Sequence, residues 1–245
     1  MSEPEREEFE TVDSSYFVHR LPANLIATAA ALAVAITLVD AEALTGAALG
    51  LSAKTWWYIV LALPIAHQLY VWAFWRGELC WRALGRRYGA EEGFAWFRRL
   101  FFMFLLARPL VALGLALADR GTLVEPGLAT YLLGALLFVP AAWTMYSVEK
   151  YFGPYRAAGA DHFIARYRTM PFERRGAFRY VPNAMYTLGF LLFWAIAIAL
   201  ASRAALVAAG YVHVVIWIHY LTLERPDMEV IYGEGLARYR RGERA

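Results

Sequence analysis

Four polar and aromatic side chains recur at helical spacing in the last part of the sequence. They are His213, Trp217, Tyr220 and Glu224, and steps of four, three and four residues place them on one face of a helix. Trp and Tyr also gather where a membrane meets water, and a His can mediate helix contacts, so such a stripe can be purely structural. The glutamate at the end of the stripe is not explained by a purely structural role. The stripe is therefore a candidate part of a functional site.

A second cluster precedes the stripe. Asn183, Tyr186 and Gly189 are spaced by three residues behind Pro182, which suits the first turn of a helix. A glycine there allows close approach of another backbone or a ligand. If the two helices are antiparallel, the segments 179–189 and 220–232 meet at one end of the pair, and we predict the site at this meeting point.

Other chemistries are disfavoured. The single cysteine, Cys80, excludes an internal disulfide and a cysteine-rich zinc site. The sequence has no P-loop, no Gly-x-Gly-x-x-Gly turn and no His-Glu-x-x-His pair.

Arg108 lies in an apolar segment, where a charged side chain should face the protein interior or a wet cavity. Both a structural and a site role are open for it.

The elements that must position these residues are membrane spans. The chain is 60% hydrophobic, its mean hydropathy is +0.40, and its apolar residues are clustered. A spanning helix needs about 20 mostly apolar residues. We therefore predict an all-α, polytopic bundle of about six transmembrane helices, at Leu21–Val39, Trp56–Trp75, Leu100–Ala118, Leu128–Ser147, Ala184–Ala201 and Ala204–Leu223. The last two form a tight hairpin.

Lys and Arg predict the orientation of the bundle. The segment after the second span, the segment after the fourth span and the C-terminal tail are rich in Arg, whereas the other loops hold one positive charge each. Basic loops stay inside, so we expect both termini and the two longest loops to be cytoplasmic. The first twenty residues form an acidic leader that does not resemble a secretory signal. The arginines then orient the chain and attract anionic lipid headgroups, and the net charge of +3 requires no nucleic acid.

The last two fifths of the chain, Glu149–Tyr239, resemble membrane methyltransferases of the phospholipid N-methyltransferase and isoprenylcysteine carboxyl methyltransferase superfamily. The phosphatidylethanolamine branch is the most similar. Three stretches carry the resemblance: Arg179-Tyr-Val-Pro-Asn183-Ala-Met185-Tyr186 followed by Gly189, Glu224-Arg225-Pro226 with Ile231-Tyr232-Gly233, and Tyr151-Phe152-Gly153. The chain departs from the family where the proline precedes Asn183, where two residues separate Tyr186 from Gly189, and where Arg225 replaces a second glutamate. We expect residues 1–148 to hold the acidic leader and four spans, and residues 149–245 to form the methyltransferase-like region.

The resemblance implies a site for S-adenosylmethionine as the methyl donor. Asn183, Tyr186 and Gly189 would line one side, and the other would carry a second set: Tyr220, Glu224, Arg225 and Tyr232. A carboxylate suits the donor's ammonium group or ribose hydroxyls, aromatic faces suit its sulfonium, and an arginine suits its carboxylate.

The implied reaction is transfer of a methyl group to a membrane lipid, with the amine of phosphatidylethanolamine or its methylated derivatives as acceptor. The amine must first lose a proton, and the candidate bases are Asp161, His162, His219 and Glu229. Alternatives are an isoprenylcysteine or small-thiol methyltransferase, an NADPH enzyme similar to sterol reductases, and a non-catalytic lipid-binding scaffold. The Ala- and Arg-rich composition favours a prokaryotic plasma membrane. The oligomeric state is open.

Overall fold

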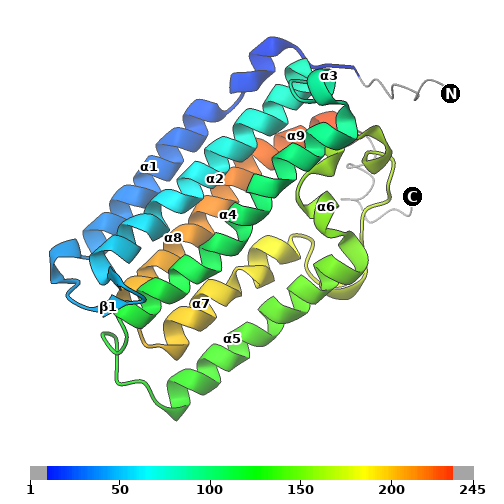
Figure 1. The fold of residues 1–245 in the computed structure, drawn as a ribbon. Coiled ribbons are helices and arrows are strands. Elements are labelled where there is room, and N and C mark those ends of the chain that lie inside the picture. Colours follow the sequence, from blue (N-terminus) through cyan, green and yellow to red (C-terminus); the bar gives the residue numbers. More distant parts are fainter. Residues whose placement is uncertain (1–9, 234–245) are drawn as a thin grey trace.

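The computed structural model describes residues 10–233, and these form a bundle of long helices (Figure 1). Acidic residues of the predicted leader at positions 3–8 and the tail arginines from Arg238 onward lie outside the described residues. The principal helices are α1 (Leu21–Leu38), α2 (Ala53–Trp81), α4 (Ala90–Ala118), α5 (Leu128–Ser147), α7 (Leu191–Ala199), α8 (Arg203–His219) and α9 (Arg225–Tyr232). Shorter elements are the hairpin of β1 (Ala47–Ala48) and β2 (Leu51–Ser52), the helices α3 (Gly85–Tyr88) and α6 (Pro154–Ala157), and several 3-10 or π-helical turns.

Within residues 10–233, five helical segments are long and apolar enough to cross a membrane: Ser14–Leu38, Ala53–Trp81, Ala90–Ala118, Leu128–Phe152 and Arg203–Tyr232. The prediction of an all-α polytopic membrane bundle is confirmed. The remaining predicted span forms a shorter apolar helix, Met185–Ala199. At 1.5 Å per residue it is about 22 Å long, whereas the hydrocarbon core is roughly 30 Å thick.

The segment after the second span is not the long loop expected from the sequence. Helix α2 continues to Trp81 and α4 begins at Ala90, so only α3 and its flanking turns lie between them. The Glu78 carboxylate accepts hydrogen bonds from the backbone N–H groups of Leu84 and Gly85, each at 3.0 Å. These bonds satisfy donors at the start of α3 that no helical carbonyl reaches, and they fix the tight turn.

The helices pack closely through small residues. A Cβ atom on Gly134 of α5 would lie 2.7 Å from the Cβ of Ala199 and 3.0 Å from the carbonyl oxygen of Ala195. At this point α5 and α7 therefore pack too closely for any side chain larger than the hydrogen of glycine. In Figure 1, α7 lies between α5 and α4. The turn from α7 to α8 is tight, as predicted, and Ser202 caps α8 by accepting a hydrogen bond from the N–H of Ala205 at 3.0 Å.

The described end of the acidic leader is packed against the bundle. The 3-10 turn η1 (Ser14–Val18) lies against the end of α2. The indole of Trp72 donates to the carbonyl of Phe17 at 2.9 Å, and the Arg76 guanidinium donates to the carbonyl of Tyr16 at 2.5 Å. The ring of Phe17 also packs on Trp72 and Trp81, with centroids 4.5 and 4.7 Å apart. The acidic leader therefore ends in a short segment that is anchored to α2.

Two π-helical turns face each other at one end of the bundle. They are η7 (Met185–Gly189), which precedes α7, and η8 (Tyr220–Glu224), which joins α8 to α9. A π turn bonds residue i to i+5 and turns less per residue than an α-helix, and such turns are frequent at functional sites. Residues spaced by three in these turns therefore do not share one face as they would in an α-helix.

Candidate active site

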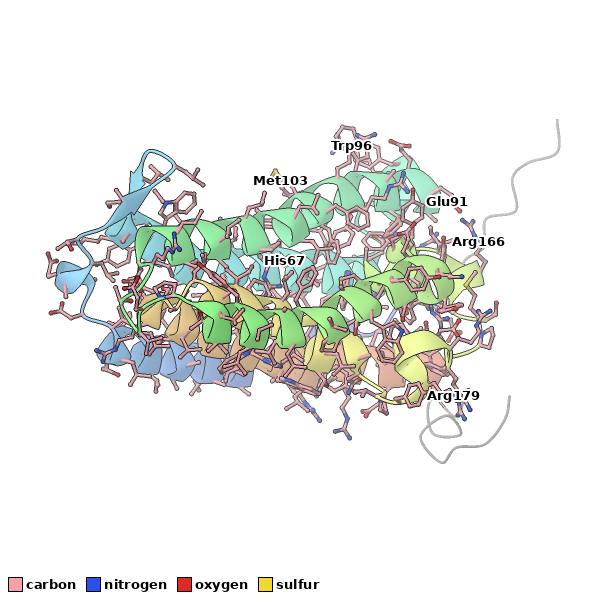
Figure 2. The ribbon with its side chains drawn as sticks, turned by 90° about the horizontal axis from the view of Figure 1, so that it is seen from below. His67, Glu91, Trp96, Met103, Arg166 and Arg179 are labelled. Atoms are coloured by element: carbon pink, nitrogen blue, oxygen red, sulfur yellow. The ribbon has the colours of Figure 1, made fainter. Side chains whose placement is uncertain are left out.

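A pocket lies at the end of the bundle where α9 meets the end of α2 and the segment 152–172. It has about 460 Å³ of empty volume, part of which is open to solvent. In Figure 2, Arg166 and Arg179 lie at one end of the bundle, and His67 lies midway along it. The lining residues are Trp75, Phe152, Arg156, Ala157, Gly159, Asp161, His162, Phe172, Met185, Glu224, Met228 and Tyr232.

The wall that carries Asp161 and His162 depends on a glycine. Gly159 has φ +78°, and a Cβ atom there would lie 2.4 Å from a ring carbon of Trp75. The chain can therefore pass directly over the indole, and the 3-10 turn η4 (Ala160–His162) follows. The imidazole of His162 stacks on Trp75 with ring centroids 4.1 Å apart. This packing holds the Asp161-His162 pair at the pocket wall.

His162 is held between two carboxylates. Its Nδ1 lies 3.0 Å from Oδ1 of Asp161, and its Nε2 lies 3.4 Å from Oδ2 of Asp227. Burial alone would lower the pKa of His162, but the hydrogen bonds and charges of the two aspartates raise it to about 9. Burial acts to raise the pKa of Asp161, yet His162 and the hydroxyl of Tyr232, which donates to Oδ2 at 2.6 Å, hold it below its usual value. At neutral pH the pair is an imidazolium and a carboxylate.

Asp227 anchors a second set of contacts behind the pocket. It is fully buried, and its Oδ1 lies 2.6 Å from Nε of the fully buried Arg76. The hydroxyl of Tyr16 donates to the same oxygen at 2.9 Å, and the Arg76 guanidinium lies over the Tyr16 ring at 4.0 Å. The sequence interpretation missed this network, since Arg76 was assigned to the basic surface of a loop. It is instead a buried ion-pair partner within α2.

The two segments predicted to meet do so through Tyr186 and Glu224. The Tyr186 hydroxyl donates a hydrogen bond to Oε2 of Glu224. The Tyr186 ring lies 5.8 Å from the ring of Tyr220 and 6.3 Å from that of Trp217. His213 accepts a hydrogen bond from the indole of Trp194 at 3.1 Å. The polar-aromatic stripe therefore faces η7 and α7, and only Glu224 of the stripe lines the pocket.

All three predicted donor-binding residues on the η7 side lie outside the pocket lining, although Tyr186 reaches the lining residue Glu224 through its hydroxyl. A Cβ atom on Gly189 would lie 2.9 Å from the terminal carbon of Met145, so this glycine serves contact with α5. The backbone carbonyl of Asn183 accepts the N–H groups of Tyr186 and Thr187 and so begins the helical turn. The expectation that Asn183, Tyr186 and Gly189 share one face assumed an α-helix, and the π turn separates them.

Four predicted residues on the side of α8, η8 and α9 also lie outside the pocket lining, namely His219, Tyr220, Arg225 and Glu229. Arg225 and Glu229 pair with each other on the surface, 3.3 Å apart and 46% and 45% exposed. His219 is buried on another side of α8, in a small cavity that Asn24 and Gln68 also line.

The pocket has features that the sequence interpretation did not single out. Trp75, Phe172 and Met228 line it together with Arg156, whose guanidinium donates to the carbonyl of Pro171 at 2.7 Å. These positions carry no spacing signal, because they come from α2, α6, α9 and the irregular segment before Gly176. Within residues 10–233, no group of three or more His, Cys, Asp or Glu side chains is arranged to hold a metal ion.

The fold and the pocket define a polytopic membrane protein with a pocket lined by acidic and aromatic side chains at one end of its helical bundle. Residues 129–235 match the family model of phospholipid methyltransferases, which confirms the predicted resemblance and supports membrane methyltransferase activity. Every residue that lines the pocket except Trp75 falls within this match. No curated protein and no solved structure matches the chain.

Proposed function

We propose that this protein transfers a methyl group from S-adenosylmethionine to a membrane lipid, with the amine of phosphatidylethanolamine or its methylated derivatives as acceptor. The observation that carries the proposal is the pocket, which presents the carboxylates of Asp161 and Glu224 among aromatic rings inside the region that matches the phospholipid methyltransferase family.

The side chains of the pocket fit the donor's chemical groups. The carboxylate of Glu224 suits an ammonium group or ribose hydroxyls. The rings of Trp75 and Phe172 suit an adenine and a sulfonium, which aromatic faces attract. Arg156 lies between Phe152, at 5.1 Å from the ring centroid, and Phe172, at 6.0 Å, and suits a carboxylate. S-adenosylmethionine supplies a methyl group already activated by a positively charged sulfur, so the protein's main task is to align the acceptor.

The acceptor's ammonium must lose a proton before its nitrogen can attack. His162 is poorly suited to take it, since Asp161 and Asp227 keep its imidazole protonated at neutral pH. Glu229 and His219 lie outside the pocket lining. Asp161 is a carboxylate on the pocket wall, and we assign the proton-accepting role to it. Tyr232 and His162 orient Asp161 through hydrogen bonds.

The orientation proposed from the basic segments makes the pocket cytoplasmic. The donor then arrives from the cytosol, while the lipid reaches the site from within the bilayer. Exposed arginines near the pocket end, such as Arg166 and Arg179, would meet anionic headgroups.

Calorimetric titration of S-adenosylmethionine into the full chain in nanodiscs tests the proposal. Glu224→Ala is expected to weaken binding at least tenfold, equivalent to about 1.4 kcal/mol. Glu91→Gln is the matched control, because Glu91 is exposed and pairs with Arg166 outside the pocket lining. Transfer of labelled methyl to vesicles containing phosphatidylethanolamine then tests the acceptor. Absence of donor binding by correctly folded wild-type protein would refute the proposal.

A further inference from the structure

Arg108 is a buried cation in the membrane-spanning part of α4. Its side chain is 7% exposed, and among residues 10–233 no carboxylate forms an ion pair with it and its Nε has no hydrogen-bond partner. Its guanidinium lies over two aromatic rings, at 5.0 Å from the centroid of Phe190 and 5.8 Å from that of Phe193. Charged side chains at such depth are expensive and normally pair with an opposite charge. An anion from outside the chain would supply it.

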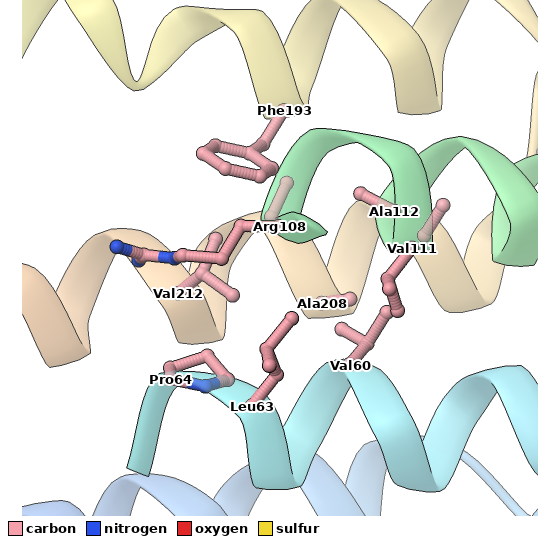
Figure 3. A pocket seen from close by; sticks show the side chains of 11 residues that line it. Val60, Leu63, Pro64, Arg108, Val111, Ala112, Phe193, Ala208 and Val212 are labelled. Carbon is pink, nitrogen blue, oxygen red and sulfur yellow. The ribbon is translucent and has the colours of Figure 1, made fainter. Parts of the chain in front are cut away.

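The cavity beside Arg108 is apolar and lies between four helices. Its empty space of about 330 Å³ includes space that is open to the surroundings, and it is lined from α2, α4, α7 and α8. In Figure 3, Arg108 extends from α4 between Phe193 on one side and Pro64 on the other. Small side chains leave the space open, namely Ala112, Ala205, Ala208 and Ala209. A hydrocarbon chain suits this lining, whereas a fully hydrated anion does not.

Arg108 also lies close to the donor side of the proposed site. The Phe190 ring contacts both its guanidinium and Tyr186, whose ring centroid is 6.3 Å from that of Phe190. Tyr186 in turn donates its hydroxyl hydrogen to Glu224, which lines the pocket. Arg108 and the carboxylate-phenol pair therefore share one aromatic neighbour.

We propose that Arg108 and this cavity bind the anionic oxygen group and the hydrocarbon chain of a lipid within the membrane. The guanidinium pairs with a phosphate or carboxylate, and the chain lies against the apolar side chains on the open side of the cavity. That this lipid is the methyl acceptor rests on the proposed function, whereas the binding itself does not. The acceptor class is then a lipid with a negative charge near the methylated group.

Equilibrium lipid binding to the purified full chain in detergent, measured without donor by native mass spectrometry, tests this inference. The probes are dioleoylphosphatidylethanolamine, oleate and the uncharged dioleoylglycerol. Arg108→Gln is expected to lower affinity for the charged probe at least tenfold and to leave dioleoylglycerol unchanged. Arg108→Lys should lose less affinity than Arg108→Gln. Arg99 is an exposed arginine on the same helix, and Arg99→Gln should lose less than twofold in affinity.

The two charged probes distinguish the sources of the anion. If Arg108→Gln loses affinity for phosphatidylethanolamine alone, the anion is a phospholipid phosphate. If it loses affinity for oleate alone, the anion is a single-chain carboxylate. Ala208→Leu keeps the charge and fills the cavity, so it should also weaken binding at least tenfold. Equal binding of both charged probes by wild type, Arg108→Gln and Ala208→Leu overturns the inference.

Thermal unfolding of the lipid-free protein separates binding from a structural role. Arg108→Gln should unfold at the same or a higher temperature than wild type, because it removes an uncompensated charge from apolar surroundings. A lower unfolding temperature would assign Arg108 to the fold and contradict the inference. Donor titration of the same samples keeps the two proposals apart, since wild type can bind S-adenosylmethionine without Arg108-dependent lipid binding, or the reverse.

Discussion

Asp227→Asn should be strongly destabilising, because one carboxylate compensates two buried cations. Asp227 has no exposed surface, and its oxygens lie 2.6 Å from Arg76 and 3.4 Å from His162. The Arg76 side chain is 0% exposed and that of His162 is 2% exposed, so neither gains water when the carboxylate is neutralised. The hydroxyl of Tyr16 loses a charged acceptor at the same time.

The expected loss is about 3–5 kcal/mol, the usual cost of leaving a buried charge without its partner. The matched control is Glu229→Gln on the same helix, which removes an equal charge from a pair with Arg225 that is nearly half exposed. That substitution should cost at most about 0.5 kcal/mol, since water and salt screen surface pairs.

The free energy of unfolding of both variants can be measured by reversible denaturation in mixed micelles. The double variant Arg76→Met and Asp227→Leu should recover part of the loss, because it removes the isolated charge. A loss for Asp227→Asn no larger than that of Glu229→Gln would refute the reasoning. It would show that water reaches Arg76 and His162 despite their burial.

Three further predictions follow from contacts described above. The free energy of unfolding should decrease by roughly 3 kcal/mol between about pH 6.5 and pH 9. The reason is that the folded-state pKa of His162 is raised to about 9, so the protonated imidazole stabilises the fold at low pH and is lost as the pH rises. The free energy of unfolding of His162→Gln should not depend on pH in this way. Gly134→Val should lower the unfolding temperature, since even a Cβ atom would lie 2.7 Å from Ala199, and an unchanged temperature would show that α5 can move away. Tyr232→Phe should slow methyl transfer more than it weakens donor binding, because Asp161 loses the hydroxyl that orients it, and equal effects on both would contradict the role given to Asp161.

The spans and the meeting of two segments could be predicted from the sequence because they depend on composition and periodicity. Runs of apolar residues report burial in lipid directly, and a short turn at Ser202 makes neighbouring helices antiparallel. The contact between Tyr186 and Glu224 follows from that geometry. The expectation that Asn183, Tyr186 and Gly189 share one face was wrong, because the helical periodicity changes there. Gly189 faces α5 because η7 is a π turn, and the sequence contains no signal for that turn.

The buried ion network could not be predicted from the sequence. Arg76 follows an apolar run and resembles the surface arginines near it, and only Asp227, far along the chain, makes its burial tolerable. Tyr16 lies in a segment whose acidity indicated a solvated leader. Pairings between distant residues leave no periodic trace in a single sequence, so neither the network nor the place of Trp75 beside His162 was visible.

The contact between Tyr16 and Asp227 joins residues 211 positions apart and has a consequence for biogenesis. A ribosome delivers η1 and α2 to the membrane long before it delivers α9, so Arg76 has no ion-pair partner until Asp227 is synthesised. Insertion of α9 therefore neutralises the charge of Arg76. A product that stops before α9 keeps that charge unpaired.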